Sequence, residues 1–205
     1  ALVGEEVTQT GRIRPTTTDP VLICRSDVSQ TMIGLDHSTV RVVHRDLPGL
    51  QHLVIVDCPD PDTTEDEAAA ASNLARLRAI LPHCDVLLVV ATQQKSLNAR
   101  VSRELRDASE GSHLVLVQTH ADRDSDIRDD WREQLRKQRI EPRAMFFVDS
   151  QSAMRARELG HTPAGEFGDL LELLSHELAG TAANRIRRAN FLDLLSQTLA
   201  RCRTK

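Results

Sequence analysis

The chain has 205 residues, of which 40% are hydrophobic and 27% are charged, enough apolar material for one substantial core. Its formal net charge of -4 gives no electrostatic reason to expect a nucleic-acid partner. Aromatic residues make up only 2% and tyrosine is absent, which also argues against platforms that stack nucleic-acid bases.

The four cysteines and eight histidines show no spacing typical of a metal site, such as C-x-x-C or H-x-x-x-H. The longest apolar stretch is too short to cross a bilayer, and the 205 residues show no signal-peptide pattern. Widely spaced cysteines of this kind are typical of reduced thiols in a cytosolic protein. We therefore expect a cytoplasmic location, with peripheral attachment to a membrane as an open alternative.

Four short apolar runs predict buried β-strands, at residues 53–56, 86–91, 114–117 and 144–148. Each run is almost continuously apolar rather than alternating, as in strands covered on both faces of a parallel sheet. Segments with helical spacing lie between and after them, at residues 64–81, 96–108, 125–137 and 166–178. The alternation of strand and helix predicts an α/β fold with a doubly wound, mostly parallel sheet.

One edge of this sheet is expected to be antiparallel. Residues 39–45 alternate in polarity, residues 47–50 (Leu-Pro-Gly-Leu) favour a turn, and residues 53–57 return as an apolar strand. This order predicts a β-hairpin.

The last segment, residues 181–205, is predicted to be a helical extension of a domain that covers residues 1–180. A helix expected over residues 182–203 places Phe191, Leu195, Thr198 and Cys202 on one stripe. This helix either packs on the domain with a solvated basic face, or it is the first part of a helical stalk or membrane-facing segment.

Polar residues follow the apolar runs where the strands are expected to end. They lie at residues 57–60 (Asp-Cys-Pro-Asp), 118–122 (Gln-Thr-His-Ala-Asp) and 149–153 (Asp-Ser-Gln-Ser-Ala), and a threonine-rich loop occupies residues 12–20. In an open parallel sheet, ligands bind outside the carboxyl ends of the strands. A nucleoside triphosphatase needs a magnesium ion, a carboxylate to hold it and a mobile hydroxyl that senses the γ-phosphate. Selection of guanine needs a carboxylate that accepts hydrogen bonds from the base.

These segments together resemble the Era-like and dynamin-like GTPases. Residues 57–59 resemble their DxPG switch-II box, residues 119–122 their [NT]KxD guanine-specificity box, and residues 14–17 (Arg-Pro-Thr-Thr) their switch I. Residues 149–150 fall where the last base-contacting loop is expected, and residues 1–4 (Ala-Leu-Val-Gly) resemble the N-A-L-x-G that follows the phosphate-binding loop GxxxxGK[ST]. The resemblance covers about residues 1–180 and implies a P-loop NTPase-like fold whose first strand and phosphate-binding loop are expected just upstream of Ala1.

On the phosphate side, the resemblance implies that Thr17, or its neighbour Thr16, binds Mg²⁺ and closes over the γ-phosphate. Asp57 would hold Mg²⁺ through a water molecule, and the backbone of Pro59 would lie near the γ-phosphate. The chain departs from the family pattern at Asp60, which replaces the glycine of DxPG, and no glutamine follows the switch-II aspartate to position water. Hydrolysis is then expected to depend on backbone groups, a switch-I residue or a partner.

On the base side, the resemblance implies that Asp122 reads guanine and that Thr119 braces the neighbouring loops. The backbone N–H of Ser150 would approach the carbonyl oxygen of the base. His120 stands where the family has lysine. An imidazole stacks on a purine but lacks the long apolar stem of lysine, so the preference for guanine is expected to be softened.

The function implied is a switch that binds GTP and GDP with Mg²⁺ and hydrolyses GTP to GDP and phosphate. The 205 residues by themselves are expected to bind nucleotide poorly, because the phosphate-binding loop supplies most phosphate contacts. A homodimer across the nucleotide face, and a membrane or protein partner reached through the C-terminal region, are open alternatives.

Two other functions stay open at this point. One is a catalytically inactive interaction module on the same fold. The other is a phosphohydrolase of the haloacid-dehalogenase-like kind, because residues 60–64 (Asp-Pro-Asp-Thr-Thr) match the DxDxT motif in which the first aspartate, here Asp60, attacks phosphorus. That motif is expected to begin where its strand ends, and the strand is expected to end at Asp57.

Overall fold

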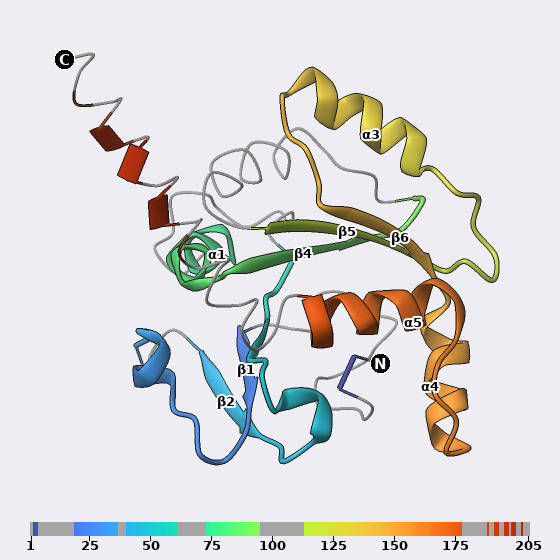
Figure 1. Ribbon diagram of the computed structural model, residues 1–205, viewed down its shortest axis with the longest axis horizontal. Coiled ribbons are helices and arrows are strands. Elements are labelled where there is room, and N and C mark those ends of the chain that lie inside the picture. Colours follow the sequence, from blue (N-terminus) through green and yellow to red (C-terminus); the bar gives the residue numbers. More distant parts are fainter. Residues whose placement is uncertain are drawn as a thin grey trace. The chain divides into compact units, whose positions relative to one another are not determined.

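The computed structural model describes residues 2–3, 19–36, 40–60, 73–94 and 113–177, together with single helical positions between 188 and 202 (Figure 1). The chain divides into two compact units, an N-terminal unit (Ala1–His83) and a C-terminal unit (Cys84–Lys205). Each unit contains its own three-stranded sheet. The N-terminal sheet is mixed and the C-terminal sheet is entirely parallel.

The N-terminal sheet is built around a short central strand. Strand β1 (Val21–Cys24) pairs in parallel with β2 (Arg41–His44) and antiparallel with β3 (Ile55–Asp57), in the order β2-β1-β3. All four residues of β1 are buried, because the strand has a neighbour on each side. The core of this unit gathers Val21, Ile23 and Leu50.

The expected hairpin between residues 39–45 and 53–57 is wrong. The strands that form in these segments, β2 and β3, lie on opposite sides of β1 and do not pair with each other. The physical reason is that β1 is apolar at every position and loses least by taking the central place, where both its backbone edges and both its faces are covered. An antiparallel pairing does form in this sheet, but it joins β1 to β3.

Short helical segments complete the N-terminal unit. Single 3-10 turns form at Gln30–Ile33 and Pro48–Leu50, and α1 spans Asn73–Ile80 before a further turn at Leu81–His83. The helix predicted over residues 64–81 is thus helical in its described part and ends next to Pro82, which cannot continue it. The start of that helix and the whole helix predicted over residues 96–108 lie outside the described residues.

The C-terminal unit confirms a parallel sheet for three of the four apolar runs. The run at residues 53–56 instead contributes β3 to the other sheet, where it pairs antiparallel with β1. The strands of the C-terminal unit are β4 (Val86–Ala91), β5 (His113–Thr119) and β6 (Ala144–Val148), with β5 in the centre. The limits of β4 and β6 are those expected from the sequence, whereas β5 is longer at both ends.

Helices cover both faces of this sheet. Helix α3 (Arg128–Lys137) lies on one side and α5 (Gly165–Glu172) on the other (Figure 1). A π-helical turn, Leu173–Glu177, continues α5, so the helix expected over residues 166–178 is present with a widened last turn. The buried side chains from these helices include Trp131, Leu135, Phe167 and Leu170.

Helix α4 (Ser150–Glu158) is not among the helices that the sequence predicts. The sequence favours a loop at residues 149–153, but Asp149 caps the helix and Ser150 is already its first residue. Helix α3 also differs from expectation: it begins at Arg128 rather than near residue 125, because the residues before it form a loop bonded to β5.

The described positions beyond residue 187 are helical, as expected for the C-terminal extension. Four of their apolar side chains are exposed, at Phe191 (63%), Leu192 (58%), Leu195 (44%) and Leu199 (52%). Within the described part of the chain, no helix combines the length and apolarity that a membrane span requires.

Candidate functional site

The carboxyl ends of β4, β5 and β6 meet along one edge of the C-terminal sheet. The strand register places Ala91 beside Gln118, and Thr119 beside Val148. The loops that leave β5 and β6 therefore start next to each other. They carry four of the residues that the sequence proposed for nucleotide binding: Thr119, His120, Asp122 and Ser150.

The loop after β5 is tied to the strands on both sides. The hydroxyl of Thr119 donates to the carbonyl oxygen of Ala91 at 3.3 Å, which joins the end of β5 to the end of β4. The N–H of Ala121 donates to the carbonyl oxygen of Val148 at 3.1 Å, which joins the loop to the end of β6. The start of the loop is thus fixed relative to the whole sheet edge.

Residues 120–124 form a tight turn. The carbonyl oxygen of His120 accepts hydrogen bonds from the N–H groups of Arg123 (3.0 Å) and Asp124 (2.8 Å). His120 has a φ of 66°, in the left-handed region. This conformation costs a residue other than glycine about 1 kcal/mol, so the surrounding bonds must hold it in place.

Asp122 occupies the exposed middle of this turn. Among the described residues, no hydrogen-bond donor or cation contacts its carboxylate. The carboxylate is therefore presented to solvent from a fixed backbone, at the edge of the sheet where ligands of open α/β folds bind.

Two glutamines hold the second half of the loop. The sequence alone did not indicate this role for either of them. The side chain of Gln118 is fully buried; its amide nitrogen donates to the carbonyl oxygen of Ser125 at 2.6 Å, and its amide oxygen accepts from the N–H of Ile127 at 2.9 Å. The amide oxygen of Gln93 accepts from the N–H of Ser125 at 3.0 Å, and its backbone N–H donates to Asp124 at 3.4 Å. A polar residue at the end of a buried apolar strand needs such partners, which is the signal that could have identified Gln118.

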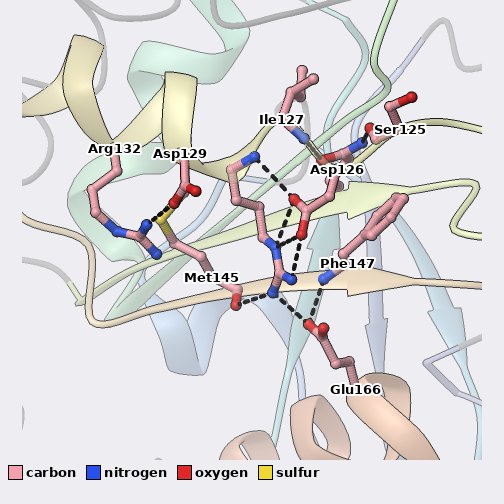
Figure 2. A network of polar contacts seen from close by, with 10 residues as sticks. Ser125, Asp126, Ile127, Asp129, Arg132, Met145, Phe147 and Glu166 are labelled. Atoms are coloured by element: carbon pink, nitrogen blue, oxygen red, sulfur yellow. Dashed lines mark hydrogen bonds and ion pairs between the residues drawn. The ribbon is translucent and has the colours of Figure 1, made fainter.

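Arg128 joins the end of the loop to β6 and α5 through Met145 and Glu166, which are labelled in Figure 2. Its guanidinium bonds to both carboxylate oxygens of Asp126, to the carbonyl oxygen of Met145 at 3.2 Å and to Glu166 at 2.6 Å. The same oxygen of Glu166 accepts from the N–H of Phe147 at 2.7 Å, and the guanidinium lies 5.9 Å from the centre of the Phe147 ring. Hydrogen bonding to Arg128 lowers the pKa of Asp126, so this carboxylate is charged at neutral pH.

The loop after β6 turns at once into α4. Asp149 caps this helix by accepting from the N–H groups of Gln151 and Ser152, each at 3.0 Å, and it also bonds to the hydroxyl of Ser152. These bonds lower the pKa of Asp149. The N–H of Ser150, at the first position of the helix, has no acceptor within the helix and lies at its positive end.

The residues proposed for the phosphate side lie in the N-terminal unit. Asp57 is the last residue of β3, half-buried, and Pro59 is buried just beyond it. Asp60 lies three residues past the strand end, and its carbonyl oxygen accepts from the side chain of Asn73 at 3.1 Å. Thr16 and Thr17 lie outside the described residues.

The described residues contain no group of three or more His, Cys, Asp or Glu side chains that could hold a metal ion. Magnesium in nucleotide sites is held by one or two protein oxygens, with phosphate and water oxygens as its other ligands. A single strand-end carboxylate such as Asp57 fits that donor set.

Cys24 and His44 resemble a nucleophile and its base, with 3.7 Å between the thiol sulfur and Nδ1. However, Nδ1 lies 3.0 Å from the carbonyl oxygen of Arg25, which can only accept, so Nδ1 carries a proton and cannot take one from the thiol. Burial raises the pKa of Cys24, which also keeps the thiol protonated. The pair is therefore structural.

No protein-family model, curated protein or solved structure matches this sequence. The chemistry of the site therefore has to be inferred from its residues. The C-terminal sheet edge offers an exposed carboxylate on a rigid turn, a half-buried imidazole beside it and a helix N-terminus on the next loop.

Proposed function

We propose that the chain is the larger part of a GTPase domain similar to those of the Era-like and dynamin-like proteins, and that the carboxyl edge of its C-terminal sheet binds the guanine base. The observation that carries this proposal is the carboxylate of Asp122, exposed on a turn that follows directly on β5 and is hydrogen-bonded to the end of β6.

The chemistry of guanine suits this carboxylate. The base presents a ring N–H and an exocyclic amine side by side, and a carboxylate accepts from both at once. Adenine presents a lone pair in place of the ring N–H, so it would leave one carboxylate oxygen facing an acceptor. The loop is held in place before any ligand arrives, which lowers the entropy cost of binding.

The base carbonyl oxygen would be met by the first N–H of α4, at Ser150. This group has no acceptor within the helix, and the positive end of the helix favours an oxygen acceptor. Asp122 and Ser150 leave neighbouring strands, so one flat ring held at this edge would meet donors and acceptors from two loops.

The phosphate side of the proposal rests on Asp57 and on Thr16 or Thr17, as the resemblance implies. Mg²⁺, when bound, would neutralise charge on the phosphates, and Asp57 would orient it through water. The printed sequence contains no GxxxxGK[ST] segment, which GTP hydrolysis of this kind requires. The proposed activity therefore belongs to the product of the complete reading frame, and we expect little turnover from the 205 residues alone.

The test is base selectivity in that complete protein, measured as the affinity for GTP, ATP and XTP. We expect GTP to bind at least about tenfold more tightly than ATP, and Asp122→Asn to weaken GTP binding while improving XTP binding relative to GTP. Xanthine carries a second carbonyl in place of the amine, so an amide that donates suits it better than a carboxylate. Equal affinity for GTP and ATP in the unmodified protein would refute the proposal.

Asp130→Asn serves as the matched control, because Asp130 is an exposed carboxylate on the outer face of α3 and its replacement removes the same charge. It should leave all three affinities unchanged. The rate of GTP hydrolysis, measured in parallel, distinguishes an enzyme from a catalytically inactive interaction module. Binding of guanine nucleotides without any GTP hydrolysis would show that the protein is such a module.

A further inference from the structure

Two side chains of the turn, on either side of Asp122 in sequence, contact each other. Nη2 of Arg123 lies 3.0 Å from Nδ1 and 3.1 Å from Nε2 of His120. One atom at nearly equal distance from both ring nitrogens cannot lie along the in-plane lone pair of either, so this guanidinium nitrogen lies over the face of the imidazole. The contact therefore holds the ring by its face, whichever ring nitrogen carries the proton.

The backbone of the turn brings the side chains of His120 and Arg123 together. The hydrogen bond from the N–H of Arg123 to the carbonyl oxygen of His120 brings the two ends of the turn close together. The left-handed φ of His120 sets the direction in which its side chain leaves the turn. Asp122 lies between the two residues, so the three side chains belong to one short, fixed segment.

We propose that Arg123 is a positioning and specificity residue of the nucleotide site, which holds the imidazole of His120 beside the carboxylate of Asp122. The two planar groups then provide the surface on which a purine ring is stacked. This inference rests on the proposed guanine-nucleotide site. In that site His120 stands where the similar GTPases have lysine, and Arg123 is the side chain that compensates for the difference.

The need for such a residue follows from the length of the histidine side chain. The flexible stem of a lysine can follow a purine ring, whereas an imidazole is useful only if its plane is fixed. Imidazole and guanidinium groups both stack on nucleobases, and a ring whose plane is already held by the guanidinium loses less entropy when the base arrives.

The experiment is a double-mutant cycle on the affinity for a fluorescent GDP analogue, with the product of the complete reading frame. We expect Arg123→Ala to weaken binding about five- to tenfold, and the double variant with His120→Ala to be no weaker than His120→Ala alone. In a His120→Lys background, Arg123→Ala should have no effect, because the lysine does not depend on the guanidinium. Arg132→Ala, which removes an exposed arginine from α3, is the control and should bind normally.

A second measurement needs no nucleotide. The side-chain nitrogen resonances of His120 in the 205-residue chain should shift when Arg123 is replaced by alanine, because the ring loses the cation that lies over its face. Unshifted resonances would show that the contact is absent from the protein in solution and would overturn the inference.

The outcomes also separate the inference from the function on which it rests. If the unmodified protein prefers GDP to ADP but Arg123→Ala binds as tightly, the role of Arg123 is wrong and the guanine site stands. The same conclusion follows if Arg123→Ala weakens binding equally in the His120→Lys background. If the unmodified protein does not distinguish GDP from ADP, both are wrong.

Discussion

Arg128 and Glu166 form a 2.6 Å ion pair beside β6, which lies at one edge of the described C-terminal sheet. An outermost strand presents N–H and C=O groups that have no neighbouring strand. Here the carbonyl oxygen of Met145 bonds to Arg128 and the N–H of Phe147 bonds to Glu166 (Figure 2). Two side chains from helices on opposite faces of the sheet thus satisfy backbone groups that a further strand would otherwise satisfy.

Arg128→Met should destabilise the protein by roughly 2 kcal/mol, because Glu166 and the carbonyl oxygen of Met145 lose a charged partner in a half-buried position. The measurement is unfolding by urea followed through the fluorescence of Trp131, the only tryptophan of the chain, which is 1% exposed. Arg132→Met removes an exposed arginine from the same helix, paired only across the helix surface with Asp129, and should change the free energy of unfolding by less than about 0.5 kcal/mol. Equal effects of the two changes would contradict this role of Arg128.

Asp149→Ala should cost about 1 kcal/mol at pH 7, because α4 loses the side chain that caps it. Asp149→Asn keeps an acceptor for the two N–H groups and should cost less. The same urea titration, read from Trp131, gives both values.

The two variants also make a prediction about pH. The pKa of Asp149 is lowered from its usual value of 3.8, chiefly by bonds from Ser152, so its charge stabilises the folded state. This contribution is complete above pH 3.8 and is lost as the pH falls through the lower pKa of the folded state. The stability difference between the natural protein and Asp149→Asn should therefore shrink as the pH falls below that value. A difference that stays constant from about pH 7 to about pH 3 would show that the charge of Asp149 does not stabilise the folded state.

Gly168→Ala should destabilise α5 by about 1–3 kcal/mol. A Cβ atom at this position would lie 2.7 Å from the carbonyl oxygen of Pro163, closer than the two atoms can approach, and this oxygen belongs to the backbone and cannot rotate away. At Gly49 a Cβ atom meets nothing within 4 Å, so Gly49→Ala should be neutral or slightly stabilising. Thermal unfolding followed by far-UV circular dichroism compares the two, and a melting temperature unchanged by Gly168→Ala would show that the close approach does not exist.

The cysteines should differ sharply in reactivity towards an aromatic disulfide reagent at pH 8. Burial, and then the nearby charge of Asp85, raises the pKa of Cys84 to about 11, and Cys24 is fully buried, so neither offers an accessible thiolate. Cys202 is exposed and should react first. Mass spectrometry of the labelled peptides should find Cys24 modified only after denaturant is added and Cys84 modified more slowly than Cys202. Early modification would contradict the burial of Cys24 or the raised pKa of Cys84.

The sequence predicts the C-terminal sheet well because a parallel strand covered on both faces must be apolar throughout. β4 and β6 are apolar throughout, although Val90 of β4 is 57% exposed, and their limits could be read directly. β1 is as short and as apolar as the runs at residues 53–56 and 114–117, so the same criterion applied to residues 21–24 predicts it. The mistaken hairpin follows from the omission of β1, since β2 and β3 need that strand between them.

The sequence predicted at which edge of the sheet the candidate site lies, but not the hydrogen bonds that hold its loops. That the loops carrying Asp122 and Ser150 start next to each other follows from the parallel strands, whose carboxyl ends share one edge. The helix at Ser150 was missed even though Asp149 is a good N-cap residue, because the same two residues also resemble a base-contacting loop. The bonds from Gln93 and Glu166 join residues that are distant along the chain, and no local pattern reveals such partners.

The covered flank of β6 has a consequence for how this sheet can grow. Its outward-facing amide and carbonyl groups at Phe147 and Met145 are already engaged by side chains, so another strand would have to displace an ion pair to join there. Growth of the sheet at β6 would therefore cost the interaction between Arg128 and Glu166 as well as their bonds to the strand.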